Sequence, residues 1–235
     1  MDNKEINKTL ISFWNESIKL SEEDKKEIIS APNADPFELA PSLKLLEVIK
    51  ELGSCHNVLD YGCGGGWASF IASKSGAHQV TAVDLGEDII ETVKTYAKSY
   101  NINNVMAKKI EPDWLKTVPD NTYDGLISSN VLDVVPIETA QEIIKQLARI
   151  VTDNAKVIIS LNFYMSEEMA QKRNIQLMEH KYLIMNGVLR LTSLKDEEWE
   201  ALFSPYFKVI KLDYFAWPGE AKETRRLYIL KKNNL

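Results

Sequence analysis

The chain has 235 residues, of which 45% are hydrophobic and 26% charged, and these proportions exclude a disordered or membrane-embedded chain. Its formal net charge of −6 argues against an extended nucleic-acid-binding surface, which normally shows as clustered lysine and arginine, so nucleic acid is not an expected partner. The apolar runs are too short to span a bilayer and the polar N-terminus does not read as a secretory signal, so we expect a cytoplasmic protein without a membrane span.

The region before residue 41 predicts a helical cap. Over residues 1–30, apolar side chains recur at helical spacing, namely at Ile6, Leu10, Phe13, Trp14 and Ile18. Residues 21–24 have the spacing of a capping box, which predicts the start of a second, short helix. A proline-containing break at 31–36 precedes a further helix over 41–52, and Gly53 is predicted to end it.

From residue 56 onward, predicted strands and helices alternate. Apolar runs predict strands at 57–61, 78–84, 104–110, 123–130 and 155–162. Helical periodicity lies between them, at 65–75, 86–100 and 137–151. This alternation predicts a parallel sheet with helices on both faces.

The pattern changes after Asn162. Residues 166–180 predict a helix, and Asn186-Gly187 is the preferred two-residue turn for a hairpin over 182–191. A capping signal then predicts a helix over 194–203. The chain ends with a predicted antiparallel pair of strands at 206–216 and 225–232.

A glycine-rich loop follows the strand predicted at 57–61. A dinucleotide fingerprint starting at Gly62 would place its last glycine at position 67, where this chain has tryptophan. The spacing that fits is Asp-x-Gly-x-Gly-x-Gly, filled by Asp60, Gly62, Gly64 and Gly66. A strand, a glycine loop and a helix in this order point backbone N–H groups at a bound ligand, which predicts a nucleotide-cofactor site.

This loop resembles motif I of the class I S-adenosylmethionine-dependent methyltransferases. A second acid supports the resemblance, because Asp84 ends the next predicted strand 22 residues beyond Gly62. The resemblance implies a Rossmann-like, doubly wound α/β sheet of seven strands in the order 3-2-1-4-5-7-6, with strand 7 antiparallel. It also implies S-adenosyl-L-methionine as the cofactor.

The resemblance implies roles for residues around the loop. Gly62, Gly64 and Gly66 would pass beneath the methionine and ribose of the cofactor, with Cys63 between them as a small residue that fits. Asp60 would orient the loop or contact the amino group through water.

Two further segments would hold the rest of the cofactor. Asp84 would bind the ribose hydroxyls and Leu85 would pack on the adenine. After the third strand, the adenine-contacting position falls at Ile110 or Glu111, and the register leaves Asp113 and Trp114 as further candidates.

The acceptor side of the site is less sharply marked. Asn130 is the polar candidate beside the methionine and acceptor, with a simple strand-end turn residue as the alternative. Asp133 stands where many small-molecule methyltransferases have histidine, so it is a candidate base or amine-binding group, or else a solvated acid. Tyr164 follows the fifth strand and is a candidate pocket wall. His180 is a candidate base, or else an exposed residue, and Trp14 and Tyr182 lie in segments expected to cover the pocket.

Three alternatives to a small-molecule methyltransferase stay open. They are an RNA or protein methyltransferase, an NAD(P)-dependent oxidoreductase, and a non-catalytic cofactor-binding protein. Neither the two cysteines nor the three histidines have the spacing of a metal site, so no metal is expected. The sequence leaves the oligomeric state undetermined between a monomer and a homodimer.

We expect one methyltransferase domain over residues 1–235. Within it, we expect an N-terminal helical cap at 1–40, a cofactor-binding core at 41–165, a helix-hairpin-helix insertion at 166–205 and terminal antiparallel strands at 206–235.

Overall fold

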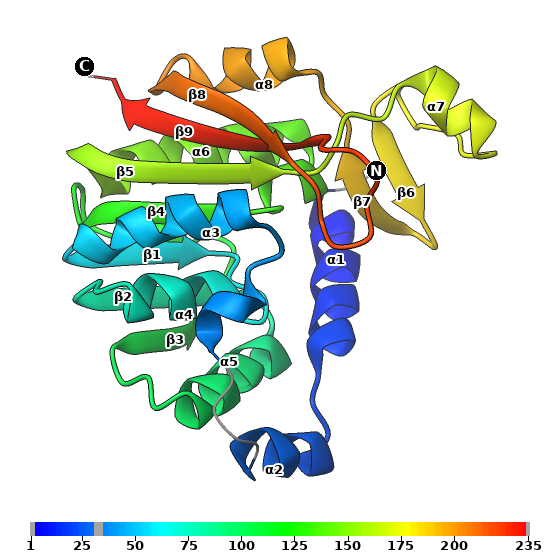
Figure 1. Ribbon diagram of the computed structural model, residues 1–235. Coiled ribbons are helices and arrows are strands. Elements are labelled where there is room, and N and C mark those ends of the chain that lie inside the picture. Colours follow the sequence, from blue (N-terminus) through cyan, green and yellow to red (C-terminus); the bar gives the residue numbers. More distant parts are fainter. Residues whose placement is uncertain (1–2, 31–34, 234–235) are drawn as a thin grey trace.

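A seven-stranded sheet in the order β3-β2-β1-β4-β5-β9-β8 forms the centre of the computed structural model (Figure 1). Its strands are β1 Asn57–Tyr61, β2 Gln79–Asp84, β3 Val105–Lys109, β4 Tyr123–Ser129, β5 Val151–Leu161, β8 Phe207–Phe215 and β9 Arg225–Lys232. Strands β1 to β5 pair in parallel, and β9 is antiparallel to both of its neighbours. The predicted fold class is therefore confirmed, including the order of the seven strands and the antiparallel last one. The structure describes residues 3–30 and 35–233, with side chains from residue 8 onward.

Strand alternation explains how the sheet buries both faces. In β5, Val157, Ile159 and Leu161 join one hydrophobic cluster, whereas Ile158 joins the cluster on the opposite face. Successive side chains of a strand point to opposite faces, so an uninterrupted apolar run fits a strand that is covered on both sides.

Helices cover the two faces in separate groups. One face carries α3 Leu43–Lys50, α4 Trp67–Lys74 and α5 Glu87–Ser99. The other face carries α6 Ile137–Ile150 and α8 Asp196–Phe203. In α6 the buried residues are Ala140, Ile144, Leu147, Ala148 and Ile150, and the first four recur at the spacing of one helical face.

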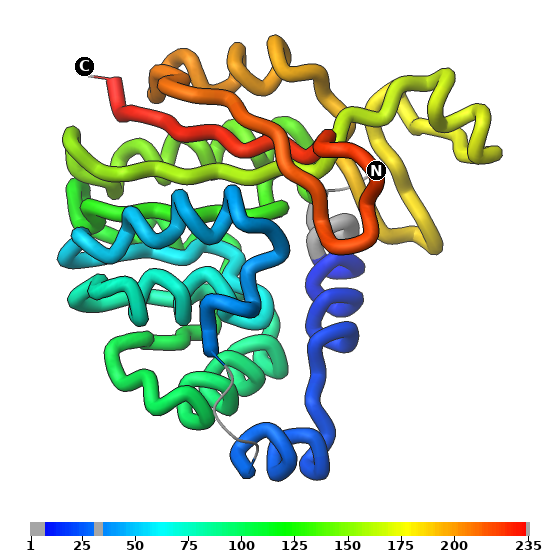
Figure 2. The backbone as a smooth tube through the Cα atoms, in the orientation of Figure 1, coloured from blue at the N-terminus to red at the C-terminus, as the bar shows by residue number. Residues whose placement is uncertain are grey.

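The N-terminal cap consists of α1 Asn3–Ile18 and α2 Glu22–Ser30, and Figures 1 and 2 show α1 running across the edge of the sheet at which the parallel strands end. Two reciprocal hydrogen bonds of 2.8 Å join the Asn15 side chain to the backbone N–H and the carboxylate of Asp88, in the first turn of α5. The Thr92 hydroxyl donates to the Ile18 carbonyl. Helix α1 is therefore fastened to α5. The predicted stripe is seen from Leu10 onward, while the Ile6 side chain and residues 31–34 of the predicted break lie outside what the structure describes.

The segment between β5 and β8 contains α7 Glu167–Lys172 and a hairpin of β6 Tyr182–Met185 and β7 Val188–Thr192. The turn at Asn186-Gly187 has positive φ at both residues, 52° and 76°, as a type I′ hairpin turn requires. The helix predicted over 166–180 is wrong beyond Lys172. Asn174 takes a positive φ of 55° just after the helix, a conformation that asparagine tolerates and that ends helices.

Several element boundaries also differ from the sequence prediction. Short 3-10 helices occur as η1 Pro36–Leu39, η2 Glu51–Ser54, η3 Trp114–Thr117 and η4 Leu132–Val134. The helix predicted over 41–52 ends at Lys50, and Gly53 lies within η2 rather than stopping the helix. Strand β5 starts at Val151, four residues before the predicted start at 155. The polar run from Thr152 to Asn154 hides that start, because it carries no apolar signal.

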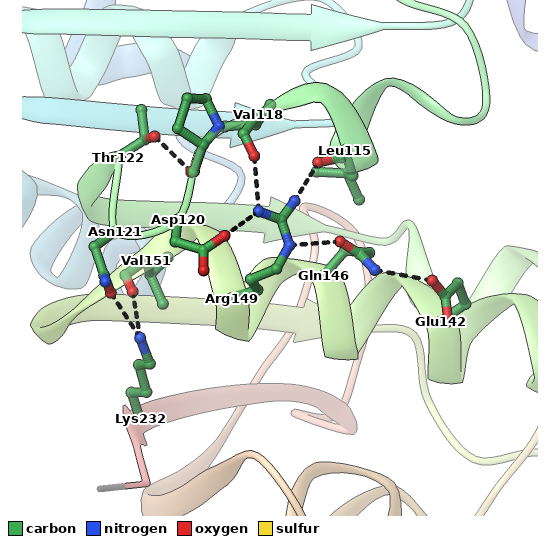
Figure 3. Close-up of polar contacts among 11 residues, drawn as sticks. Leu115, Val118, Asp120, Asn121, Thr122, Glu142, Gln146, Arg149, Val151 and Lys232 are labelled. Carbon is green, nitrogen blue, oxygen red and sulfur yellow. Dashed lines mark hydrogen bonds and ion pairs between the residues drawn. The ribbon is translucent and has the colours of Figure 1, made fainter. Parts of the chain in front are cut away.

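A polar cluster ties the loop before β4 to α6 (Figure 3). The Arg149 guanidinium donates to the carbonyls of Val118 and Leu115 at 2.8 and 2.7 Å, and to the Asp120 carboxylate and the Gln146 side chain at 2.5 and 2.8 Å. All three of its nitrogens thus have a partner, so this arginine serves the scaffold.

Candidate functional site

The glycine loop turns sharply after β1. The backbone N–H groups of Gly62 and Cys63 both donate to the Val83 carbonyl of β2, at 2.9 and 3.0 Å, which holds the loop against the end of the neighbouring strand. Helix α4 then begins with Gly66 as its N-cap. The order strand, turn and helix matches the prediction, and it leaves the N-terminus of α4 beside the loop, an arrangement suited to polar ligand groups.

Positive φ angles explain why glycines occupy the loop. Gly62 has φ 72°, and a Cβ there would stand 2.2 Å from the Val131 side chain. Gly66 has φ 83°, and a Cβ there would stand 2.9 Å from the Phe70 ring. By contrast, a Cβ at Gly65 would have no heavy atom within 4 Å. Two of the predicted cofactor glycines are therefore required by backbone conformation and close packing together.

Asp84 stands at the end of β2, next to the loop. Its Oδ2 accepts a hydrogen bond of 3.1 Å from the Gly64 N–H, and its Oδ1 accepts from the N–H groups of Leu85 and Gly86 at 2.7 and 3.3 Å. Burial raises the pKa of this carboxyl, and the three backbone donors oppose that shift. The carboxylate is thus held by the backbone while it keeps lone pairs for further hydroxyl donors.

Asp60 is 2% exposed and lies beneath the loop. Its Oδ2 accepts a hydrogen bond of 2.6 Å from the Ser69 hydroxyl of α4. Burial raises the pKa of Asp60 to about 7, the Ser69 hydrogen bond opposes this, and the nearby Asp84 adds to it. Cys63 is buried as well, and burial also raises the pKa of its thiol, so it packs as a small residue in the loop.

The raised pKa of Asp60 makes stability depend on pH. Between about pH 4 and 7 the folded protein binds more protons than the unfolded chain, so Asp60 lowers the free energy of unfolding as the pH rises through this window. Asp60→Asn removes the buried charge but keeps an acceptor for Ser69. We expect the difference in free energy of unfolding between Asp60→Asn and the wild type, measured by urea titration, to shift in favour of the variant by on the order of 2 kcal/mol from pH 5 to pH 8.

The matched control is Asp113→Asn, whose carboxylate is 80% exposed and pairs with Lys116 on the surface. Its stability relative to the wild type should be the same at both pH values. Parallel pH profiles for the wild type and Asp60→Asn would contradict the assignment of the buried charge to Asp60.

The residues predicted to contact the adenine differ in their burial and in their contacts. The Ile110 N–H donates to the Asp84 carbonyl at 2.9 Å, and its side chain is 5% exposed, so it lies beside the candidate ribose site. Leu85 is partly buried against the core near the same strand end. Glu111 is instead exposed and pairs with Lys109. Among the candidates of this segment, Ile110 has the placement that suits an adenine contact.

Asn130 ends β4 with a positive φ of 55°. Its backbone N–H donates to the Ser160 carbonyl at 2.8 Å, but the buried side-chain Oδ1 has no hydrogen-bond partner in the described part of the chain. A buried polar atom without a partner is costly, so this oxygen is available to a hydrogen-bond donor of a bound ligand. This geometry fits the predicted position beside the cofactor and acceptor.

Asp133 is fully buried on η4, so the alternative of a solvated acid is wrong. Its Oδ2 accepts a hydrogen bond of 2.5 Å from the Asn162 backbone N–H, whereas Oδ1 has no partner among the described residues. Burial raises the pKa of Asp133, opposed by the hydrogen bonds to Asn162 and by the charge of Arg226. The acid therefore links η4 to the end of β5.

Asn162 is a residue that the sequence did not single out. Its carbonyl accepts from Arg226 at 2.7 Å, and its side-chain oxygen accepts from Arg225. Arg226 in turn pairs with Asp196 at 2.6 Å and is 1% exposed. Asn162 thus joins η4, β9 and α8 at the carboxyl edge of the sheet, and its partners are too distant in sequence to have been recognised.

The remaining acceptor-side candidates are placed differently from one another. Tyr164 is partly buried directly after β5, where a pocket wall was expected. His180 lies in a turn with a positive φ of 62°, its side chain is 86% exposed, and its ring contacts Glu167. The structure does not bring His180 to the glycine loop or to Asn130. Tyr182 accepts a hydrogen bond of 3.5 Å from the Ile137 N–H, at the start of α6.

Helix α1 and the hairpin meet over this edge of the sheet. The Arg190 guanidinium of β7 lies 4.0 Å from the ring centre of Phe13 and 5.4 Å from that of Trp14. Thr192 of β7 also donates a 2.6 Å hydrogen bond to the Val135 carbonyl, just after η4. The two segments predicted to cover an acceptor pocket therefore touch each other.

Within residues 3–30 and 35–233, no group of three or more histidine, cysteine, aspartate or glutamate side chains is arranged to hold a metal ion. In the same part of the chain, no helix is both long and apolar enough to cross a bilayer.

Comparison with known proteins identifies a relationship over the first part of the core. Residues 58–154 match the family model described as a methyltransferase domain. A ubiquinone biosynthesis O-methyltransferase of Coxiella burnetii is 34% identical over 119 residues, which cover 50% of this chain and 48% of that protein. A ribosomal protein L11 methyltransferase of Lactobacillus johnsonii is 30% identical over 118 residues, covering 50% of this chain and 35% of that protein. The chain therefore spans about half the length, or less, of these curated relatives.

Solved structures show the same fold over more of the chain. The PH0226 protein of Pyrococcus horikoshii superposes with a TM-score of 0.67 at 21% identity, covering 81% of this chain and 89% of that one. An S-adenosylmethionine-dependent methyltransferase of Mesorhizobium loti superposes with a TM-score of 0.63 at 16% identity, covering 84% of this chain and 100% of that one. At these identities the likeness concerns the fold.

Proposed function

We propose that this chain is a class I S-adenosylmethionine-dependent methyltransferase and that it transfers a methyl group from S-adenosylmethionine to a small-molecule acceptor, as the family-model match over residues 58–154 and the similarity to a named O-methyltransferase support. The observation that carries the proposal is the pairing of Asp84 with the glycine loop. A carboxylate held by three backbone N–H groups stands beside a loop in which side chains are excluded. This combination suits a ribose with two free hydroxyls, joined to a methionine portion that must lie close to the protein backbone.

Within this proposal, Asp84 holds the ribose hydroxyls and Gly62, Gly64 and Gly66 give the methionine portion room to lie on the backbone. The bound cofactor supplies a methyl group already activated on a sulfonium, so the protein contributes mainly binding and orientation. Aligning the nucleophile with the methyl carbon and sulfur lowers the barrier by up to roughly 7–11 kcal/mol in favourable cases. The free Oδ1 of Asn130 is our candidate for orienting the cofactor amino group or the acceptor.

Asp133 has a different role in this proposal. Its Oδ2 is engaged by the Asn162 backbone and its side chain is fully buried. We assign it to the positioning of η4 rather than to proton abstraction from the acceptor. A methyl transfer that needs no general base, or one that uses Tyr164, is compatible with the residues present.

The small-molecule acceptor rests on two supports. One is the relative named for ubiquinone biosynthesis, which acts on oxygen of a small molecule according to its name. The other is the contact between α1 and the hairpin, which covers the carboxyl edge of the sheet and favours an enclosed acceptor over an extended polymer. A cytoplasmic location stays a prediction, as do the division of the chain into four segments and the choice between monomer and homodimer.

A protein acceptor is the second candidate, because the relative from Lactobacillus johnsonii is named for a ribosomal protein. The two candidates differ in what the covering segments must admit. Methyl transfer to a small-molecule extract without transfer to protein fractions would support the first candidate, and the reverse would support the second.

The proposed cofactor predicts a selective gain in thermal stability. A ligand that binds the folded state alone stabilises it by about 2.7 kcal/mol at 100 times its Kd. S-adenosylhomocysteine at that excess should therefore raise the melting temperature by several degrees, whereas NAD at equal concentration should not. Micromolar binding of NAD with no binding of S-adenosylhomocysteine in calorimetry would overturn the proposal in favour of an oxidoreductase.

A further inference from the structure

Arg190 differs from the other described arginines in how its charge is compensated. Arg149, Arg225 and Arg226 each pair with a carboxylate, of Asp120, Glu220 and Asp196 respectively. Arg173 stacks on Phe163, but it is exposed to water. Arg190 is partly buried, and among residues 8–30 and 35–233, whose side chains the structure describes, no acid or hydrogen-bond acceptor is paired with its guanidinium.

An unpaired cation is unexpected in this chain. Acidic residues outnumber basic ones, 34 to 28, so an acidic partner would be easy to supply. Sheltering an arginine from water without a counter-charge costs free energy, and sheltered charges are normally paired. The contrast with Arg149, whose nitrogens all have acceptors (Figure 3), shows that this protein satisfies an arginine where the scaffold needs one.

The Arg190 guanidinium contacts two aromatic rings. Its central carbon lies 4.0 Å from the Phe13 ring centre and 5.4 Å from the Trp14 ring centre, distances at which rings attract a cation. Neither phenylalanine nor tryptophan carries a side-chain lone-pair acceptor, so these two rings do not satisfy the N–H groups of the guanidinium. A planar fork of N–H donors is the group that binds a carboxylate through two parallel hydrogen bonds.

Arg190 lies on the side of the candidate site that is assigned to the acceptor. Strand β7 is fastened by Thr192 to Val135, directly after η4, and Val188 of β7 belongs to the same hydrophobic cluster as Leu132 of η4 and Leu10 of α1. Arg190 thus lies where the covering hairpin, the covering helix and the segment after β4 come together. This is the region that the proposed function leaves for the acceptor.

We propose that Arg190 binds a carboxylate of the acceptor, so that the enzyme methylates small molecules carrying an anionic group. This inference rests on the proposed function, because the position of Arg190 is read as the acceptor side. Phe13 and Trp14 hold the guanidinium in place and line the same site with apolar surface. An aromatic or otherwise apolar acid is the class of acceptor that suits such a pair.

The test compares benzoate with benzamide, which have nearly the same shape but differ in charge. We expect calorimetry or ligand-observed NMR with the full chain, with and without S-adenosylhomocysteine, to give about tenfold tighter binding of benzoate. Arg190→Met keeps an apolar stem of similar length and should abolish the preference. Arg190→Lys keeps the charge without the planar fork and should retain only part of it.

Arg173→Met is the matched control, since it also removes an arginine from an aromatic ring and changes the net charge equally. Its benzoate preference should equal that of the wild type. The ratio of the two affinities is measured within each variant, so a loss of stability from loosening α1 does not imitate the expected result. Failure of benzoate to bind the wild type, equal binding of benzoate and benzamide, or a preference that survives in Arg190→Met would overturn the proposal.

Two further measurements separate the possible failures. Phenyl phosphate serves as a third probe, and tighter binding of it than of benzoate would overturn the choice of a carboxylate. S-adenosylhomocysteine should bind wild type and Arg190→Met with equal affinity. If it bound neither while the benzoate preference held, the proposed function would fail and the anion site would stand.

Discussion

Replacing Asp84 by asparagine is expected to weaken S-adenosylhomocysteine binding by about 100-fold. The carboxylate is the acceptor assigned to the ribose hydroxyls, and an amide offers one oxygen in place of two and no charge. Hydrogen bonds to a charged group contribute about 1.5–3 kcal/mol each. Replacing the charged acceptor of the two ribose hydroxyls by a neutral one should therefore cost about 3 kcal/mol of binding free energy. The change also removes an acceptor for Gly64 or for Leu85 and Gly86, which loosens the loop.

Calorimetric titration measures this effect, and melting without ligand measures the cost to the fold. Burial raises the pKa of Asp84, so removing the buried charge should offset the loss of a backbone acceptor and leave the unliganded protein about as stable as the wild type. The matched control is Glu91→Gln, a half-buried acid farther along α5 that pairs with Lys94, and its affinity for S-adenosylhomocysteine should stay unchanged. Unaltered affinity in Asp84→Asn would remove the ribose assignment and the main support for the proposed cofactor site.

Replacing Gly62 by alanine should destabilise the protein and abolish cofactor binding. An L-residue at φ 72° is strained by about 1–2 kcal/mol. The new methyl would also stand 2.2 Å from the Val131 side chain, and overpacking of this kind typically costs about 1–3 kcal/mol. We therefore expect the free energy of unfolding to fall by about 2–5 kcal/mol in urea titration.

A neighbouring glycine provides the control. A Cβ at Gly65 would meet no heavy atom within 4 Å, and the φ of this residue is not positive, so Gly65→Ala should change stability by less than about 1 kcal/mol. The double variant Gly62→Ala, Val131→Ala removes the clash but keeps the backbone strain. It should recover part of the loss, and complete recovery or none would show that one of the two causes had been misjudged.

Sequence reasoning succeeded where the information is local. The spacing of Asp60, Gly62, Gly64 and Gly66 determines a loop whose φ angles glycine alone tolerates well, and alternating apolar runs determine the strands. Asp84 follows from the same logic, because consecutive parallel strands end at one edge of the sheet. The hairpin at Asn186-Gly187 could also be predicted from the sequence, since those two residues favour positive φ.

What could not be predicted depends on contacts distant in sequence. Asp133 was open between a base and a solvated acid, because its partner Asn162 lies 29 residues away and becomes visible only in the folded chain. Arg190 carried no signal of its own, since nothing in β7 indicates that Phe13 and Trp14 would lie against it. The end of α7 at Lys172 was missed because apolar residues continue past it, at Ile175 and Leu177, in a segment that packs without being helical.

The attachment of α1 has a consequence for the order of folding during synthesis. Its partners are Asp88, 73 residues beyond Asn15, and Arg190, which emerges from the ribosome long after the helix itself. Until β2, α5 and β7 have been made, the apolar face of α1 has nothing to pack on, and a short helix alone is marginally stable in water. Helix α1 therefore completes its packing after much of the chain that follows it has been made.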